Sequence, residues 1–441
     1  MTGKKKQANR WLIAVIVGMA GGLSFELPYL KITYQPQMEF AFGITSTQVG
    51  IIMSLYGLLA LIFYPPSGII ADKYNHRNLI SVNLAITGAL GFVMATYPPY
   101  PVLLIIEVLW AITTILFMWS ATVKAVSMQA DENDAGALMG LSEGARGVAC
   151  LLAAIITLFI FNKLGAENNI NSFKGVLIAY GVMMILLAVA CWFVVPDGKT
   201  VSPLTTAGAE AAASQSISKA DVVSLLKMNK LWFCALYVFG TYMSYACLTY
   251  TTSYMVDCFE LSMSAATAIS ILRNQVFRTF CGPLGGLLTV KTSIRSATRW
   301  LQMGSIVNTT AFVLLAVLPI RKSMLIPVVA IVVAASFSMY LSRGLYFATI
   351  KEVGIPDRIS GTAIGLMSLI GFIPDAFVYI LIGHWQDTLE PVTAYRLMWI
   401  LGIAGTTLAT VMSVLLLRII KQRKAAAALE ADANAEVPTD A

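Results

Sequence analysis

Twelve long apolar runs constrain this chain more than any other feature. Each is about twenty residues or longer, the length that an α-helix needs to cross the apolar layer of a bilayer. Charged residues make up only 12% of the chain, too few to cover the surface of a soluble enzyme. The sequence therefore predicts an all-α membrane protein, embedded in a lipid bilayer, with twelve transmembrane helices at residues 11–35, 46–71, 78–97, 101–127, 136–161, 174–195, 230–256, 263–288, 298–319, 325–350, 360–384 and 393–419.

A polar stretch divides the twelve runs into two sets of six. Residues 196–229 are rich in small and polar residues without periodicity, which is typical of a flexible linker. We therefore expect an N-terminal six-helix bundle at 1–195, a linker at 196–229, a C-terminal six-helix bundle at 230–424 and a tail at 425–441.

Short segments also repeat between the two sets. Gly136–Leu141 reads GALMGL, and Gly361–Leu366 reads GTAIGL 225 residues later. Matching helices that run in the same direction predict two pseudo-symmetric bundles, related by an axis along the membrane normal.

The basic residues predict the orientation of the chain. Of the thirty Lys and Arg residues, nineteen fall on the side of the N-terminus. Only five fall on the other side, and six lie within the runs. Because Lys and Arg collect in cytoplasmic loops, both termini, the linker and the tail are expected in the cytoplasm. The net charge of +7 is thus a topology signal, and no nucleic-acid partner is expected.

The segment Gly68–Asn78 joins the second and third runs and holds charges of both signs in a short turn. Gly68 has no side chain where two helices could approach closely. Asp72, Lys73 and Arg77 lie at the expected membrane surface, where they could join one helix end to another.

This segment resembles the signature loop of the major facilitator superfamily, with Asn75 in place of the second glycine of that loop and His76 in place of the first basic residue after it. Asn adopts the left-handed conformation at low cost, so the resemblance implies that the turn can still form. Two further motifs, FELPY at Phe25–Tyr29 and EGARG at Glu143–Gly147, look like those of YihN-type permeases of bacterial inner membranes. The resemblance implies the fold of that superfamily, a location in the bacterial cytoplasmic membrane and transport by alternating access. It also implies that the loop residues Gly68, Asp72, Lys73 and Arg77 act as a conformational switch.

Ten charged residues lie inside the predicted membrane helices. Each costs about 2.5–3.5 kcal/mol at the bilayer centre, so we expect them to face the bundle interior or one another. Glu143 and Arg146 share one face of a helix and can pair, either as a structural ion pair or as a pair that substrate opens. The ten are the basic residues Lys31, Lys124, Arg146, Arg273, Arg278 and Arg343, and the acidic residues Glu26, Glu107, Glu143 and Asp375.

The central charges predict the substrate. Four arginines at positions 146, 273, 278 and 343 outnumber Glu143 and Asp375, although one arginine is expected to pair with Asp375. Arginine forks suit carboxylates and phosphates, so we expect an organic anion with Arg273 or Arg343 as its direct ligand. Glu26, Glu143 and Asp375 are carboxylates in a low-dielectric setting, which favours their protonated form and suggests proton coupling.

Aromatic residues are further candidates for substrate contact. In the superfamily, helices 1, 4, 7 and 10 line the central cavity, and these helices carry Tyr29, Trp119, Tyr242, Tyr250, Tyr340 and Tyr346. Helix packing is the alternative explanation for each. Lys31 lies in the outer part of the first helix and is also a candidate contact.

Several alternatives stay open at this stage. A neutral sugar is the second choice of substrate, and a drug or metabolite exporter of the same fold is another possibility. A membrane sensor would need a sizeable cytoplasmic domain, and an enzyme would need a nucleophile–base or metal constellation. Neither is visible, and the chain has no nucleotide-binding loop, so we expect a monomeric transporter without cofactor or metal.

Overall fold

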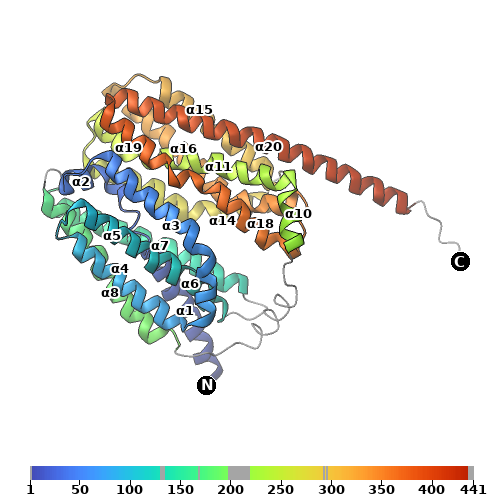
Figure 1. Ribbon diagram of the computed structural model, residues 1–441, viewed down its shortest axis with the longest axis horizontal. Helices are drawn as coiled ribbons and strands as arrows, with labels where there is room; N and C mark the ends of the chain where they lie inside the picture. The colour runs from blue at the N-terminus through green and yellow to red at the C-terminus, as the bar shows by residue number, and fades with distance from the viewer. Residues whose placement is uncertain are drawn as a thin grey trace.

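The computed structural model describes residues 2–129, 135–166, 169–196, 219–291, 294 and 296–435, and within these ranges it contains helices and no strand. Figure 1 shows long helices packed into two bundles. The N-terminal bundle contains α1 Thr2–Leu23, α2 Lys31–Phe42, α3 Ser46–Lys73, α4 His76–Met94, α5 Tyr100–Ala111, η1 Ile112–Trp119, α6 Ser120–Ser127, α7 Ala135–Lys163 and α8 Ile170–Val194. The C-terminal bundle contains α11 Asn229–Thr249, α12 Thr251–Phe259, α13 Met263–Ile271, η2 Leu272–Val276, α14 Phe277–Lys291, α15 Ala297–Val317, η3 Lys322–Met324, α16 Leu325–Leu345, η4 Tyr346–Ala348, α17 Thr349–Glu352, α18 Asp357–Gly371, η5 Ile373–Ala376, α19 Val378–Thr388 and α20 Pro391–Ala435.

These helices confirm an all-α membrane architecture. Within the described residues, ten segments are long and apolar enough to cross a membrane. Two of the twelve predicted runs do not reach that standard as continuous helices. The first keeps only Arg10–Leu23 as an apolar helix, and the eighth holds the polar residues Arg273, Asn274 and Gln275 in the π-helical turn η2 at Leu272–Val276. Both departures place polar residues near the middle of the bundle.

The first predicted helix, 11–35, is broken rather than continuous. Between α1 and α2 the chain forms tight turns at 24–30, with hydrogen bonds such as Glu26 N to Leu23 O at 3.0 Å. Pro28 lies in this break, where it has no N–H to donate and disfavours a helical residue before it. The second piece continues to Phe42 and ends at Gly43 in the left-handed conformation.

One other expectation needs correction, and part of the tail can be described. The stretch 196–229 is not aperiodic throughout, because α10 forms at Lys219–Leu226 and Leu225 is buried against the C-terminal bundle. Residues 197–218 of the predicted linker lie outside the described residues. The tail begins as a helix, since α20 runs on to Ala435 and projects from the bundle in Figure 1.

The signature loop is shorter than expected. Helix α3 includes Gly68 and continues to Lys73, so the turn consists of Tyr74 and Asn75 alone. Asn75 is extended, not left-handed, and its Oδ1 accepts the N–H of Arg77 at 2.9 Å as the cap of α4. A Cβ on Gly68 would meet nothing within 4 Å, so no close approach occurs there in this conformation.

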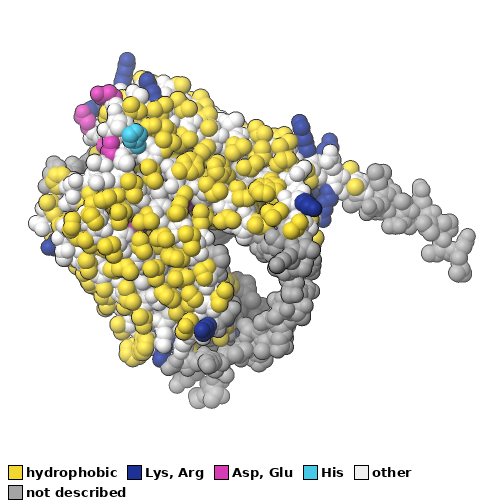
Figure 2. All heavy atoms as spheres, in the orientation of Figure 1, with side chains coloured by type: hydrophobic (Ala, Val, Ile, Leu, Met, Phe, Trp, Pro, Cys, Tyr) yellow, Lys and Arg dark blue, Asp and Glu magenta, His cyan; other side chains and the backbone are white. Residues whose placement is uncertain are grey.

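Each bundle has its own buried core. One cluster of buried side chains extends from Ile13 to Val195, and two others belong mainly to residues 225–420. Apolar side chains also cover most of the outer surface in Figure 2, and charged side chains gather toward its ends. An apolar exterior between two charged ends is what a bilayer requires.

The two bundles meet most closely where α3 crosses α19. A Cβ on Gly50 would collide with the carbonyl oxygen of Tyr379, and one on Gly383 with that of Ser46. Helices approach this closely only when small residues lie at the crossing. The beginning of α3 lies at the end of the molecule away from both chain ends in Figure 1. We call that end the opposite face, and the end with both chain ends the terminal face.

Candidate substrate cavity

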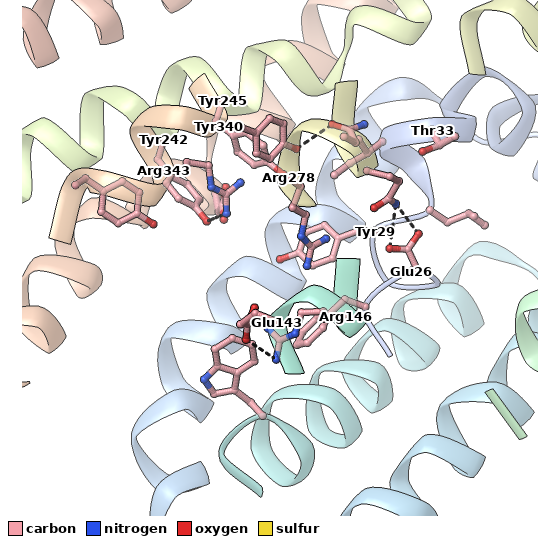
Figure 3. A pocket seen from close by; sticks show the side chains of 18 of the residues that line it. Glu26, Tyr29, Thr33, Glu143, Arg146, Tyr242, Tyr245, Arg278, Tyr340 and Arg343 are labelled. Carbon is pink, nitrogen blue, oxygen red and sulfur yellow. Dashed lines mark hydrogen bonds and ion pairs between the residues drawn. The ribbon is translucent and has the colours of Figure 1, made fainter. Parts of the chain in front are cut away.

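A cavity of about 680 Å³ lies between the two bundles. Its wall is built from the break in the first segment, from α2, α3, η1, α7 and α8 of the N-terminal bundle, and from α11, η2, α14, α16, η4 and η5 of the C-terminal bundle. Figure 3 shows arginine, glutamate and tyrosine side chains from both bundles pointing into one space. The volume suits a small solute.

Eight of the eleven candidate binding residues line this cavity: Glu26, Tyr29, Trp119, Glu143, Arg146, Arg278, Arg343 and Asp375. The other three do not. Arg273 and Tyr250 are buried at no more than 1% exposure, and Lys31 is 2% exposed. The structure brings these eight residues together, but the sequence does not reveal which way each side chain points.

Glu26 joins the two bundles at the cavity wall. Nε2 of Gln275 donates to both of its carboxylate oxygens, at 3.1 and 2.9 Å, and the hydroxyl of Tyr180 donates at 3.4 Å. Gln275 lies on η2, the π-helical turn in the eighth predicted segment. Arg278 lies close enough to attract Glu26 electrostatically, and its side chain is exposed to the cavity.

Glu143 and Arg146 pair within α7, as their spacing predicts. Their closest nitrogen–oxygen distance is 3.6 Å, and the guanidinium also lies 5.1 Å from the ring centre of Trp119. The Arg146 side chain is 12% exposed and that of Glu143 is 60% exposed. Because Glu143 is largely solvated, the pair stabilises the fold only weakly and can open at low cost.

Arg343 is surrounded by tyrosines. Its Cζ lies 5.2, 4.3 and 5.7 Å from the ring centres of Tyr242, Tyr245 and Tyr340, and one nitrogen donates to the Tyr242 hydroxyl at 3.2 Å. Aromatic faces attract a guanidinium, but they do not neutralise it. Tyr346 also accepts a hydrogen bond from Arg343, and the donors that remain can contact a ligand in the cavity.

Asp375 lies across the cavity on η5, a short turn that interrupts the eleventh segment. It is near enough to Arg343 for electrostatic attraction. However, no ion pair joins Asp375 to an arginine within the described residues, and Arg146 pairs with Glu143 instead. The direct arginine–Asp375 pair that the sequence suggests is thus not formed in this conformation.

Lys31 occupies a different place, between the cavity and the opposite face. Its Nζ lies 3.6 Å from the ring centre of Tyr250 and 4.3 Å from that of Tyr379. The Tyr250 hydroxyl in turn donates to the Tyr379 carbonyl at 2.9 Å. Lys31 and Tyr250 therefore contribute to the contact between bundles that closes the cavity.

Several cavity residues were not selected as binding residues from the sequence. The most consequential are Asn274, Gln275, Tyr180 and Tyr245. Asn274 accepts the Tyr340 hydroxyl at 3.1 Å, and Gln275 holds Glu26. Uncharged amides in the middle of an apolar run were the available signal, because they too are costly in a bilayer unless they are hydrogen-bonded.

The charge balance of the wall also differs from the expectation. Arg273 points elsewhere and Glu26 belongs to the wall, so three arginines face three carboxylates. The predicted surplus of two positive charges is therefore absent from the lining. The arginines are not neutralised equally, however, because Arg146 has a close carboxylate partner and Arg343 has only tyrosines.

At the opposite face, hydrogen bonds between the bundles close the cavity. The Asp387 carboxylate, at the end of α19, accepts the N–H groups of Ser46 at 2.9 Å and Thr47 at 2.7 Å, at the start of α3. Gln35 donates to Gln386 at 3.1 Å. The carboxylate thus caps the N-terminus of a helix of the other bundle, where a negative charge is favoured.

Glu39 lies beside this closure, outside the predicted membrane helices. Its carboxylate accepts hydrogen bonds from Ser46 at 2.6 Å and Gln35 at 2.7 Å. Burial raises the pKa of Glu39 to about 7, and the negative charges of Asp257 and Asp387 act in the same direction, while the two hydrogen bonds oppose it. The closed opposite face therefore favours the protonated form of Glu39.

Two helical bundles around a polar, aromatic cavity, with an apolar exterior, define a membrane transporter. A profile of the Major Facilitator Superfamily matches residues 10–342. The chain belongs to this superfamily, as its signature loop suggests. Membership of a family of transporters agrees with the expectation that the protein is not an enzyme.

Its relatives include two inner membrane proteins of Escherichia coli (strain K12). It is 39% identical to YqcE over 421 residues, which are 96% of this chain and 98% of YqcE. It is 28% identical to YihN over 416 residues, which are 94% of this chain and 97% of YihN.

The fold is also similar to solved structures. A bacterial homologue of the human lysosomal transporter Spinster, in an inward-facing and unoccupied conformation, aligns with a TM-score of 0.70 at 16% identity, over 95% of this chain and 98% of that one. The occupied inward-facing structure aligns with a TM-score of 0.67 at 15% identity, over 93% and 96% of the two chains. Together these matches support the twelve-helix fold.

Proposed function

We propose that this protein is a secondary transporter that moves a small organic anion by alternating access, coupled to protons. The observation that carries this proposal is Arg343, a cavity arginine whose neighbours among the described residues are tyrosines instead of a paired carboxylate. Arg278 lines the same cavity, and its side chain is drawn between those of Arg343 and Tyr29 in Figure 3. Two guanidinium groups with free donors suit a carboxylate or phosphate group.

The balanced charge of the wall supports proton coupling. An anion that enters a cavity with three arginines and three carboxylates leaves a net negative charge. Protonation of Glu26 or Asp375 restores neutrality in the low-dielectric site. Asp375 is the better candidate, because one of its oxygens is buried without a hydrogen-bond partner. Anion and proton would then travel together.

The orientation follows from the positive charges and from the closed face. We place both termini in the cytoplasm, so that the opposite face is periplasmic and the structure is an inward-facing form. The bias of Lys and Arg supports this placement, as does the inward-facing conformation of the two similar structures. A single chain encloses the whole cavity, which supports a monomer as the working unit.

Uptake into proteoliposomes tests the substrate class. Labelled organic acids and sugar phosphates are offered to wild type, Arg343→Gln and Arg273→Gln, with Arg396→Gln as a control for loss of an exposed positive charge. Loss of a charged hydrogen bond of about 1.5–3 kcal/mol predicts a rise in KM of roughly 10- to 100-fold for Arg343→Gln. Unchanged anion uptake in Arg343→Gln would contradict the assignment.

Proton coupling needs its own experiment. An inward proton gradient should drive anion accumulation by wild type. Asp375→Asn should lose this dependence on the gradient but retain exchange of labelled for unlabelled anion, because exchange needs no net proton movement. Accumulation that is independent of the gradient in wild type would exclude coupling.

A neutral sugar is the second candidate, and one observation favours it. The wall is electrically balanced and carries many tyrosines, which can stack on a sugar ring and hydrogen-bond its hydroxyls. Competition separates the two ideas. If unlabelled polyols and hexoses block uptake and anions do not, the sugar assignment replaces the anion assignment. A sensor, the alternative from another class, would bind solute without moving it.

A further inference from the structure

A second cavity, of about 570 Å³, lies apart from the transport cavity. It is formed where α15 begins and where α20 leaves the bundle, at the terminal face. It shares no lining residue with the central cavity. Figure 2 shows Lys and Arg side chains gathered where α20 leaves the bundle. We call this cavity the α15–α20 groove.

The walls of the groove are of two kinds. One part is apolar and is formed by Val414, Leu417 and Ile420 of α20. The other part is positively charged. Its cations come from both helices and are all exposed: Arg299, Arg418, Lys421 and Lys424.

Nothing within the described residues neutralises these four cations. No ion pair in that part of the chain includes Arg299, Arg418, Lys421 or Lys424. The acidic residue near the start of α15 is Glu352, and its carboxylate is already used by the N–H groups of Ala297 and Thr298 at 2.6 and 3.0 Å. Arg423, also on α20, points away from the groove and donates to backbone carbonyls of α17.

The groove lies at the level where the bilayer changes from apolar to polar. Arg299 is at the first turn of the predicted helix 298–319, and Arg418 is at the last turn of the predicted helix 393–419. Lys421 and Lys424 follow by one and two turns, at the expected headgroup level. Basic pockets between membrane helices at this depth suit phosphate headgroups.

We propose that the α15–α20 groove binds an anionic phospholipid of the surrounding bilayer. The headgroup phosphate contacts Arg299, Arg418, Lys421 and Lys424, and an acyl chain lies along Val414, Leu417 and Ile420. Binding at this position joins α15 to α20 within the C-terminal bundle. The site is independent of the transported solute and of the proposed function.

Native mass spectrometry of the detergent-purified full chain tests the proposal. Phosphatidylglycerol, cardiolipin or phosphatidylcholine is titrated, and lipid adducts are counted for wild type and for the triple variant Arg418→Gln, Lys421→Gln, Lys424→Gln. Each surface cation contributes about fivefold to affinity for an anionic lipid. The triple variant should therefore bind the anionic lipids about 100-fold more weakly, with no change for phosphatidylcholine.

Controls define the alternatives. Arg396→Gln, which removes an exposed cation from the other end of α20, should bind lipid like wild type. Thermal stability should rise with anionic lipid in wild type and not in the triple variant, whereas inorganic phosphate should stabilise neither. Equal lipid binding by wild type and triple variant overturns the proposal. Binding of anionic lipid that appears only after deletion of residues 427–441 also overturns the proposal, because the acidic tail would then be the occupant of the groove.

Discussion

Removal of the Asp387 carboxylate should open the opposite face. In the closed form this side chain accepts two backbone hydrogen bonds, at 2.9 and 2.7 Å, from the first residues of α3. A hydrogen bond to a buried charge contributes about 1.5–3 kcal/mol, but Asp387 is exposed, so we assign each bond about 0.5–1.5 kcal/mol. Asp387→Ala should then shift the equilibrium toward the open form by roughly 1–3 kcal/mol, or about 5- to 150-fold.

Thiol labelling measures this shift. Thr252 is 2% exposed and its hydroxyl donates to the Ile32 carbonyl across the closure, so a cysteine there becomes reactive only when the opposite face opens. In a background without the six native cysteines, Thr252→Cys should react with an impermeant reagent 5- to 150-fold faster when combined with Asp387→Ala. Asp387→Asn, which keeps one acceptor oxygen, should have a smaller effect. Glu390→Gln, an exposed neighbour, is the control, and equal rates in all variants would refute the reasoning.

Three further predictions use the same structure. As the pH rises from about 4.5 to 7, the ratio of closed to open protein should fall by up to tenfold per pH unit, because ionisation of Glu39 disfavours the closed form. Above about pH 7 the ratio should level off. Glu39→Gln should abolish this pH dependence in the labelling assay. Gly383→Ala should raise the labelling rate, because its Cβ collides with the α3 backbone at a cost of about 1–3 kcal/mol, whereas Gly144→Ala meets open space and should not. In thermal unfolding, Glu143→Gln alone should destabilise the protein more than the double variant Glu143→Gln, Arg146→Gln does, and the two should differ by less than about 1 kcal/mol. The reverse order would exclude a structural pair.

Much of the fold could be predicted because bilayer insertion demands long apolar helices. The breaks were harder to find. Pro28 signals the first one, but the sequence does not say that the chain resumes as a helix and runs on to Phe42. The π-helical turn at Leu272–Val276 carries no local signal beyond its polar residues. Helix α10 was missed because its eight residues are too few for a clear periodic pattern.

The candidate site shows a different limit. Charge inside a membrane helix identifies residues that must be buried in protein or face a cavity, and six of the eight charged candidates do line one. Charge alone does not show whether such a residue is buried in protein or faces the cavity. Arg273 and Arg278 are five residues apart on one segment, yet the first is 1% exposed and the second faces the cavity. At 3.6 residues per turn, positions five apart already lie about 140° apart around a helix. The sequence therefore predicts that the two side chains point in different directions, but it does not say which of them faces the cavity.

Solute counterflow tests the central claim, that the two bundles carry a solute across the membrane. Proteoliposomes loaded with an unlabelled organic anion are diluted into a trace of the labelled anion. The account predicts a transient accumulation of label above equilibrium in wild type, which is lost in Arg343→Gln and retained in Arg396→Gln. Binding of the anion without any counterflow, in protein that is folded and correctly inserted, would contradict it and identify a sensor instead.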